Sequence, residues 1–275
     1  CYLFDEEGNK VDTVWEEPGG VMSMVQVPGS NGVFLATHKF YSPNDSKEAE
    51  IVIVSPSEKE GWKIRTLVKL PHVHRFDIVT RNGINYLIAC ALKSGHTYKD
   101  DWSMPGKTYA AVLPEDLSGF DKEHQLELTV IKDNMLKNHG YYKMQENEME
   151  ICLISCDEGV YKFIPPAGIG ENWEIERLTQ TPGSDAVLVD LDRDGEPELI
   201  MISPFHGQNI YILKKIDGEY KKVYTYDTAE FAHAIYGGTL LGEPAVIIGH
   251  RKGERNLLAF TYDEKEKQYK VTVLD

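Results

Sequence analysis

Three aspartates at alternate positions form the pattern that points most directly to chemistry. Asp190, Asp192 and Asp194 lie between two short apolar runs, and Gly195 and Glu198 follow them. Alternate carboxylates on a tight turn can converge on one point, and the glycine permits the positive φ that such a turn requires. Oxygen ligands alone suit a hard cation, Ca²⁺ before Mg²⁺. The pattern therefore predicts a structural calcium site formed by Asp190, Asp192, Asp194 and Glu198, and the alternative is a plain acidic hairpin turn.

Histidines are the second group of residues able to do chemistry, and the chain has nine of them. Clustered neutral imidazoles bind Zn²⁺ or another divalent transition ion, whereas a single histidine near its pKa acts as a general base. The sequence leaves both roles, metal binding and general-base catalysis, open. The spacing of His72 and His74 places both side chains on the same side of a strand, so we predict these two residues as metal ligands.

The elements that must position these residues are short strands. Runs rich in β-branched and aromatic residues alternate with Gly, Asn, Asp and Pro turns roughly every ten residues, which is typical of an all-β sandwich, barrel or propeller. Aligned runs expose a repeat of roughly 45–65 residues, the period of propeller blades. We predict a single all-β domain over residues 1–275, a β-propeller of five or six four-stranded antiparallel blades. Residues 1–17 would form a partial N-terminal blade that continues upstream, and the best helix candidate is one turn at Asp133–Asn138.

Strand order in such a propeller predicts that most of the histidines share one face. The links between blades and the loops after second strands lie on the same side of a disc of up-and-down blades. Eight of the nine histidines fall in those places, namely His38, His72, His74, His96, His139, His206, His233 and His250. Because His139 and His233 begin the first strands of other blades, which line the channel, we predict that they converge with His72 and His74 across its mouth and act as catalytic residues.

Two long loops, at 38–47 and 93–107, belong to the same predicted face and mix aromatic, lysine, aspartate and amide side chains. Trp102 and Tyr41 can stack on a sugar, and Lys39 and Lys93 can bond its hydroxyls. The alternative is ordinary solvated loops, each with a packed aromatic anchor. The predicted substrate-binding residues are His38, Lys39, His96, Tyr98, Trp102, His206 and His250, and Lys93 is predicted as catalytic.

The composition of the chain excludes some classes of binding partner. The chain carries 29 Lys and Arg against 44 Asp and Glu, a formal net charge of −15, which argues against nucleic acid and anionic membranes. No stretch approaches the roughly 18 apolar residues of a membrane span. Cys152 and Cys156 lie four positions apart in one predicted strand, about 13 Å apart and too far for a disulfide. The cysteines, two of which (Cys90 and Cys152) lie in apolar runs, favour a cytoplasmic, reducing location, and the two long loops favour a small carbohydrate or glycan as partner.

A family resemblance appears in the acidic turn. The segment Val189–Ile200, with its Asp-Leu-Asp-Arg-Asp-Gly-Glu-Pro-Glu core, resembles the FG-GAP/VCBS repeat, a propeller blade whose acidic turn binds calcium. The corresponding turns of the other repeats lack the alternating aspartates, so the match covers one blade. Family members usually carry Asp where Glu198 stands.

A second resemblance suggests an activity. The segment His72–Pro114 and the histidine-rich channel mouth look like the propeller domain of aldos-2-ulose dehydratase and related anhydrofructose dehydratases. The resemblance implies a carbon–oxygen lyase that dehydrates a keto-sugar such as an anhydrofructose. It implies a metal ion that polarises the ketone, a histidine that removes the adjacent proton, and a Lys or protonated His that protonates the leaving hydroxyl. The rival expectation is a non-enzymatic propeller that binds a glycan or protein and uses calcium only for stability.

Overall fold

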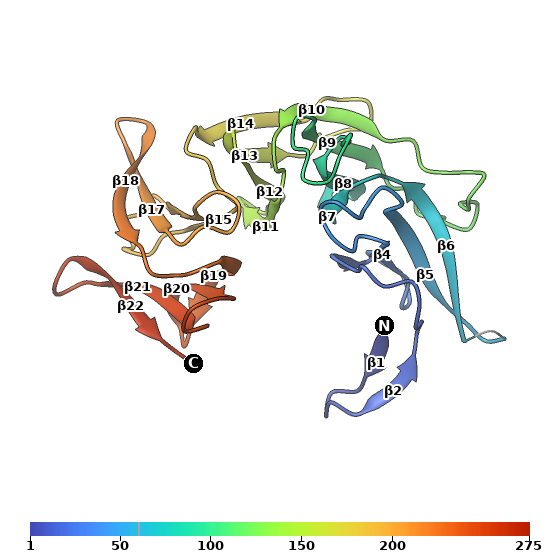
Figure 1. The fold of residues 1–275 in the computed structure, drawn as a ribbon, viewed down its shortest axis with the longest axis horizontal. Coiled ribbons are helices and arrows are strands. Elements are labelled where there is room, and N and C mark those ends of the chain that lie inside the picture. The colour runs from blue at the N-terminus through green and yellow to red at the C-terminus, as the bar shows by residue number, and fades with distance from the viewer. Residues whose placement is uncertain (60) are drawn as a thin grey trace. The chain divides into compact units, whose positions relative to one another are not determined.

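The computed structural model describes residues 1–59 and 61–275, and over these residues the chain forms 22 strands and no helix (Figure 1). The strands make five four-stranded antiparallel sheets and one two-stranded sheet. Within each four-stranded sheet the strands pair in sequence order, each with the next. This arrangement confirms the predicted all-β class and the four-stranded antiparallel repeat.

The first compact unit comprises residues 1–135 and 166–171. Its two-stranded sheet pairs β1 (Tyr2–Phe4) with β2 (Lys10–Thr13). Its second sheet contains β3 (Met24–Gln26), β4 (Phe34–His38), β5 (Glu50–Ser57) and β6 (Gly61–Lys69). Its third contains β7 (Val73–Arg81), β8 (Ile84–Lys93), β9 (Pro105–Val112) and β10 (Thr129–Met135).

The second compact unit comprises residues 136–165 and 172–275. Its first sheet contains β11 (Gly140–Glu146), β12 (Met149–Cys156), β13 (Gly159–Ile164) and β14 (Glu174–Thr179). Its second contains β15 (Asp185–Val189), β16 (Glu198–Ile202), β17 (Ile210–Ile216) and β18 (Glu219–Tyr226). Its third contains β19 (Ala232–Leu240), β20 (Glu243–His250), β21 (Leu257–Asp263) and β22 (Gln268–Val273).

Burial follows the apolar runs of the sequence. Every residue of β16 is buried, as a strand covered on both faces requires, whereas its sheet's last strand, β18, consists of exposed and half-buried residues only. In the second unit, Val187, Ile200, Ile212, Val246 and Phe260 belong to one continuous core that joins neighbouring sheets. This packing holds the ends of β15, β16 and β19 in place.

One local prediction is wrong. The helical turn expected at Asp133–Asn138 begins instead as the last residues of β10, where Met135 pairs with Gly106 across the sheet. Pairing with β9 satisfies backbone groups that an isolated helical turn would leave open. The described residues also include no helix long and apolar enough to cross a membrane.

Candidate metal centre

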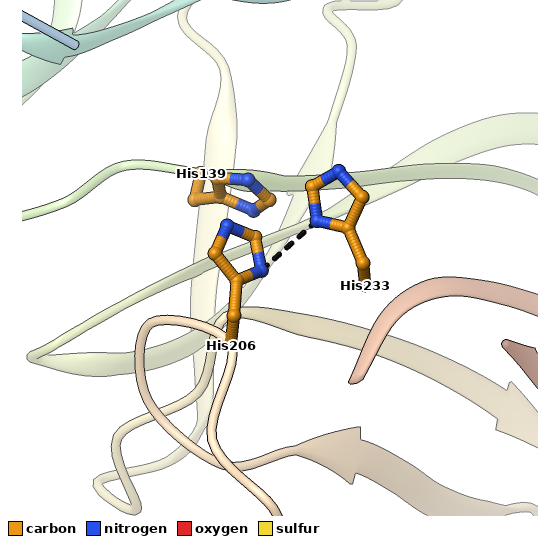
Figure 2. A group of neighbouring side chains, drawn as sticks. All are labelled: His139, His206 and His233. Carbon is orange, nitrogen blue, oxygen red and sulfur yellow. Dashed lines mark hydrogen bonds between the residues drawn. The ribbon is translucent and has the colours of Figure 1, made fainter. Parts of the chain in front are cut away.

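Three histidines of the second unit converge (Figure 2). His139 immediately precedes β11, His206 lies in the turn after β16, and His233 is the second residue of β19. One ring nitrogen from each lies within 4.8 Å of the others. His139 and His233 thus lie close to each other, His206, predicted to bind substrate, completes the cluster, and His72 and His74 are not part of it.

His139 is held by the main chain at its backbone and at its ring. The residue is only 2% exposed, and its backbone N–H donates to the Ser155 carbonyl at 3.2 Å. Its Nδ1 lies 3.0 Å from the Ser184 carbonyl oxygen. A carbonyl only accepts hydrogen bonds, so Nδ1 carries the proton and Nε2 keeps its lone pair. A backbone partner of this kind is what orients metal-binding histidines.

His206 and His233 approach each other through the same type of nitrogen. Their Nδ1 atoms lie 3.0 Å apart, and the dashed line in Figure 2 marks this contact. The ring of His206 is 4.3 Å from both the His139 and the His233 rings, measured between centroids. The two Nδ1 atoms, 3.0 Å apart, can both bind one ion at the usual Zn–N length of about 2.0–2.1 Å.

The backbone around the cluster is in an uncommon conformation. Phe205, His206 and Phe231 have φ values of 44°, 62° and 58°, in the left-handed region that bulky residues rarely adopt. A register shift between Ala232 and Ala234 also places His233 at a β-bulge. Strained residues and bulges concentrate at functional sites because they aim side chains where a regular strand cannot.

Aromatic rings and cations surround the imidazoles. The Phe231 ring stacks on His206 with centroids 4.8 Å apart, and Phe205 meets His139 edge to face at 5.9 Å. Arg251 and Lys252 lie 5.5 and 5.3 Å from the centre of the Phe231 ring. Lys137 lies 5.5 Å from the centre of the Phe205 ring and forms an ion pair with Asp157 at 3.0 Å. Three cations thus lie beside the aromatic rings of the cluster, and one of them, Lys137, is paired with Asp157.

The acidic turn has the predicted local geometry. Oxygens of Asp190, Asp192 and Asp194 lie within 4.8 Å of one another, and Gly195 has φ 91°. The Lys214 ammonium forms ion pairs with Asp192, with Asp194 at 2.6 Å and with Glu198 at 3.6 Å. These carboxylates in turn raise the pKa of Lys214 against the opposing effect of its burial.

Glu198 differs from the other predicted ligands of the turn because it is fully buried. Its Oε2 accepts from the Leu191 backbone N–H at 2.8 Å, and its Oε1 accepts from the Tyr269 hydroxyl at 3.0 Å. Burial raises its pKa. Both oxygens are therefore engaged within the protein, and Glu198 acts as a support beneath the turn.

The predicted ligand pair His72 and His74 does not form in the expected way. His72 has φ 63° and precedes β7, and a register shift follows between Val73 and Arg75. The alternation that would align the two side chains is thereby broken. His72 Nδ1 lies 2.7 Å from the Ser46 hydroxyl, whereas the His74 ring packs on Phe40 at 5.1 Å. Burial, followed by the neighbouring His96 and Lys93, lowers the pKa of His72 to about 4.

Lys93, predicted as catalytic, is a fully buried lysine of the first unit. Its ammonium donates to Asn44 Oδ1 at 2.7 Å and to the Asp101 backbone carbonyl at 3.2 Å, and it lies 4.6 Å from the centre of a Trp102 ring. Burial lowers its pKa. These contacts join the two long loops, so Lys93 has a structural role beside any chemical one.

The remaining predicted substrate-binding residues have separate surroundings. His96 lies 5.2 Å from His72 between ring centroids, and Tyr98 is exposed. His250 stabilises its own loop, because its Nδ1 contacts the Lys252 carbonyl at 2.8 Å and its Nε2 accepts from the Asn256 N–H at 3.0 Å. His38 and Lys39 line a pocket of the first unit.

Sequence reasoning missed Phe205 and Phe231. A signal for them exists, since two of the three clustered histidines follow a phenylalanine, as Phe205-His206 and Phe231-Ala-His233. Their left-handed backbone conformations have no such signal, because phenylalanine does not favour them.

Comparison with solved structures identifies the fold. The chain aligns over 98% of its length with 76% of a periplasmic gluconolactonase of Pseudomonas aeruginosa, at 11% identity and a TM-score of 0.60. Proposed 6-phosphogluconolactonases of Bacteroides uniformis and Bacteroides fragilis align at 12% and 15% identity, with TM-scores of 0.54 and 0.55. These alignments cover 98% and 100% of this chain and 76% of each of those proteins. The likeness supports the β-propeller.

No protein-family model matches the sequence, and no curated protein matches it. The expected membership in the FG-GAP/VCBS repeat family is therefore not supported. The expected keto-sugar dehydratase activity is wrong, because the similar structures are described as lactonases and not as lyases.

Proposed function

We propose that His139, His206 and His233 bind a divalent transition-metal ion, Zn²⁺ in the first place, in a centre that hydrolyses the lactone of a small sugar acid. The observation that carries the proposal is the convergence of three imidazole nitrogens within 4.8 Å. Three protein ligands with a fourth position left for water is the arrangement of a catalytic rather than a structural zinc site.

The reaction class agrees with the surroundings of the centre. Water adds to the acyl carbon, the ring carbon–oxygen bond breaks, and the proton moves to the leaving alkoxide, so that a hydroxy acid results. A bound Zn²⁺ would supply a water of pKa about 7 and polarise the carbonyl. The chain itself presents the nitrogens: Ser184 holds His139 in one tautomer, and Phe205 and Phe231 pack against the rings of His139 and His206.

The cations beside the centre support a product that carries negative charge. Arg251 and Lys252 over Phe231 lie next to the ring that stacks on His206. Hydrolysis of a lactone creates a carboxylate, which these charges attract. The similar structures are described as acting on gluconolactone or its phosphate, and the Pseudomonas protein is described as periplasmic. The cytoplasmic location predicted for this chain stays a prediction.

Metal content and lactone hydrolysis together test this function. We expect about one zinc per purified chain and acid release from glucono-δ-lactone in a pH-stat assay. His206→Ala should abolish both, whereas His124→Ala should change neither, because His124 is exposed and contacts only Asp121 among the contacts described. Full activity in His206→Ala, or in protein stripped of metal, would reject the proposal.

A further inference from the structure

The first unit contains a pocket that the metal centre does not use. It has a volume of about 380 Å³, within the range of about 300–1,000 Å³ typical of small-molecule sites, and is lined by β4, β5 and β6 together with residues near Pro18 and Asp121. A neighbouring hollow of about 510 Å³ shares Glu17, Pro18 and Lys39 with it and adds Tyr41. The two form one groove around Lys39.

A buried carboxylate lies at the base of this groove. Glu50 is only 5% exposed, and its Oε1 accepts from the Lys39 ammonium at 2.5 Å. Its Oε2 accepts from the Thr66 hydroxyl at 2.9 Å. Burying a carboxylate costs stability unless it is fully paired, and an apolar residue would serve the core of a sheet better. A paired acid in a pocket wall instead offers oriented hydrogen-bonding groups to a ligand.

His38 adds a second buried polar group to the same wall. The residue is 3% exposed and directly opposite Glu50 in the register of β4 and β5. Its Nε2 has no hydrogen-bond partner among the described residues. Lys39, the next residue, has φ 65°, and its N–H is held by the Gly19 carbonyl at 2.9 Å. The chain therefore accepts an unsatisfied imidazole and an unfavourable backbone conformation side by side at this groove.

The charges of the pocket indicate an uncharged ligand. Three acids, Glu17, Glu50 and Asp121, line it together with three bases, Lys39, Arg65 and Lys122. This balance contrasts with the net charge of −15 of the whole chain. Arg65 is occupied by the walls, because its Nη1 donates to the Leu117, Ser118 and Phe120 carbonyls at 2.8–2.9 Å.

Tyr41 supplies an aromatic side chain to the wall of the groove. Its side chain is 56% exposed and lines the hollow, so its ring is accessible to a ligand there. An aromatic face beside paired charges suits a sugar ring, which has an apolar face and a rim of hydroxyl groups. We infer that this groove binds an uncharged sugar ring, a monosaccharide or the terminal residue of a glycan, with Tyr41 against the ring and Lys39, Glu50 and His38 toward its hydroxyls.

Calorimetric titration of the full chain tests this inference independently of lactone hydrolysis. The probes are glucose, galactose, mannose and N-acetylglucosamine, with gluconate and glucosamine as charged counterparts. We expect saturable binding of at least one uncharged sugar, at least about tenfold tighter than either charged probe. Tyr41→Ala should weaken that binding about tenfold and leave the lactonase rate unchanged, and Tyr2→Ala, at another exposed tyrosine of this unit, should leave binding intact.

A second variant, Lys39→Met, removes the ammonium from the groove and leaves Glu50 bonded to Thr66 alone; it should weaken binding as well, and its melting temperature is measured to confirm that it folds. His206→Ala should retain sugar binding even if it loses metal, which separates this site from the proposed metal centre. No saturable binding of the four uncharged sugars, preference for a charged probe, or equal affinity of Tyr41→Ala and wild type would each overturn the inference.

Discussion

The proton on one imidazole decides what the histidine cluster can do. His139 can offer Nε2 to a metal only while Nδ1 donates to Ser184, and this contact depends on close approach of the backbone at Gly140. A Cβ at Gly140 would lie 2.5 Å from the Ser184 oxygen and 2.9 Å from Asp185 Oδ1, so the chain there would have to move.

Gly140→Ala therefore tests the positioning of His139. We expect zinc affinity, measured by competition with a chromogenic chelator, to fall about 10- to 100-fold, the usual effect of losing an outer partner of a metal ligand. Gly119→Ala is the matched control, because a Cβ there meets nothing within 4 Å. Unchanged zinc affinity in Gly140→Ala would mean that the Ser184 contact does not orient the ligand.

The lowered pKa of His72 predicts how the stability of the fold depends on pH. Its pKa is about 4 in the folded chain, below its ordinary value of 6.5, so the unfolded chain binds more protons between these values. The free energy of unfolding should therefore fall as the pH drops from about 6.5 to 4, by on the order of 2–3 kcal/mol from this residue alone.

Urea titrations at several pH values measure this contribution. His72→Asn should flatten the dependence between pH 6.5 and 4, because asparagine tolerates the φ of 63° and does not titrate. The exposed His124 provides the comparison, and His124→Asn should leave the slope unchanged. Identical slopes for wild type and His72→Asn would contradict the assignment.

At the scale of elements, strand β17 supplies a cation to the turn between β15 and β16. The Lys214 ammonium lies among the carboxylates that the sequence predicts as calcium ligands. A divalent ion and this ammonium would compete for the same oxygens, since both are attracted by the same negative charge. The sequence pattern of the turn shows its acidity but not the lysine that reaches it from another strand.

Lys214→Met should reveal the competition. We expect the melting temperature of wild type to be nearly the same in calcium-free buffer and in millimolar calcium chloride. Lys214→Met should melt several degrees lower without calcium and recover with it. Lys215→Met, from the exposed neighbour on the same strand, should behave like wild type. A calcium-dependent melting temperature in wild type would show that the ion displaces Lys214.

At the scale of the whole molecule, the cysteines report on global unfolding. All four are free, and Cys90, Cys152 and Cys156 are completely buried, whereas Cys1 is partly exposed. Burial raises the pKa of Cys90 to about 12 and also raises that of Cys156, so their reactive thiolates are scarce. The missing Cys152–Cys156 disulfide agrees with the distance expected from the sequence.

A thiol reagent such as Ellman's reagent should therefore modify one cysteine quickly in the native protein. The other three should react at the rate of unfolding, and all four at once in denaturant. Rapid reaction of more than one thiol in native buffer would show that a sheet opens locally. A Cys1→Ser variant is the control, and it should lose the fast phase alone.

The approximate positions of the strands were predictable because their signals are local. Apolar runs such as 199–202 and turn residues such as Gly195 act within a few residues, and they place the strands and the positive φ where the structure has them. The order of strands also predicted that His139 and His233 approach one another, but it wrongly added His72 and His74 to the same cluster. The short helix at Asp133–Asn138 was wrong because pairing with β9 outweighs a weak local preference.

The centre itself depends on contacts between residues far apart in the chain. His206 joins the cluster through left-handed residues and His233 through a bulge, and His72 and His74 separate through another irregular register. Lys214 and Tyr269 reach the acidic turn from other strands. Residue types and strand rhythm follow from local chemistry, whereas the direction of a side chain follows from register, backbone strain and packing, which exist only once the sheets have assembled.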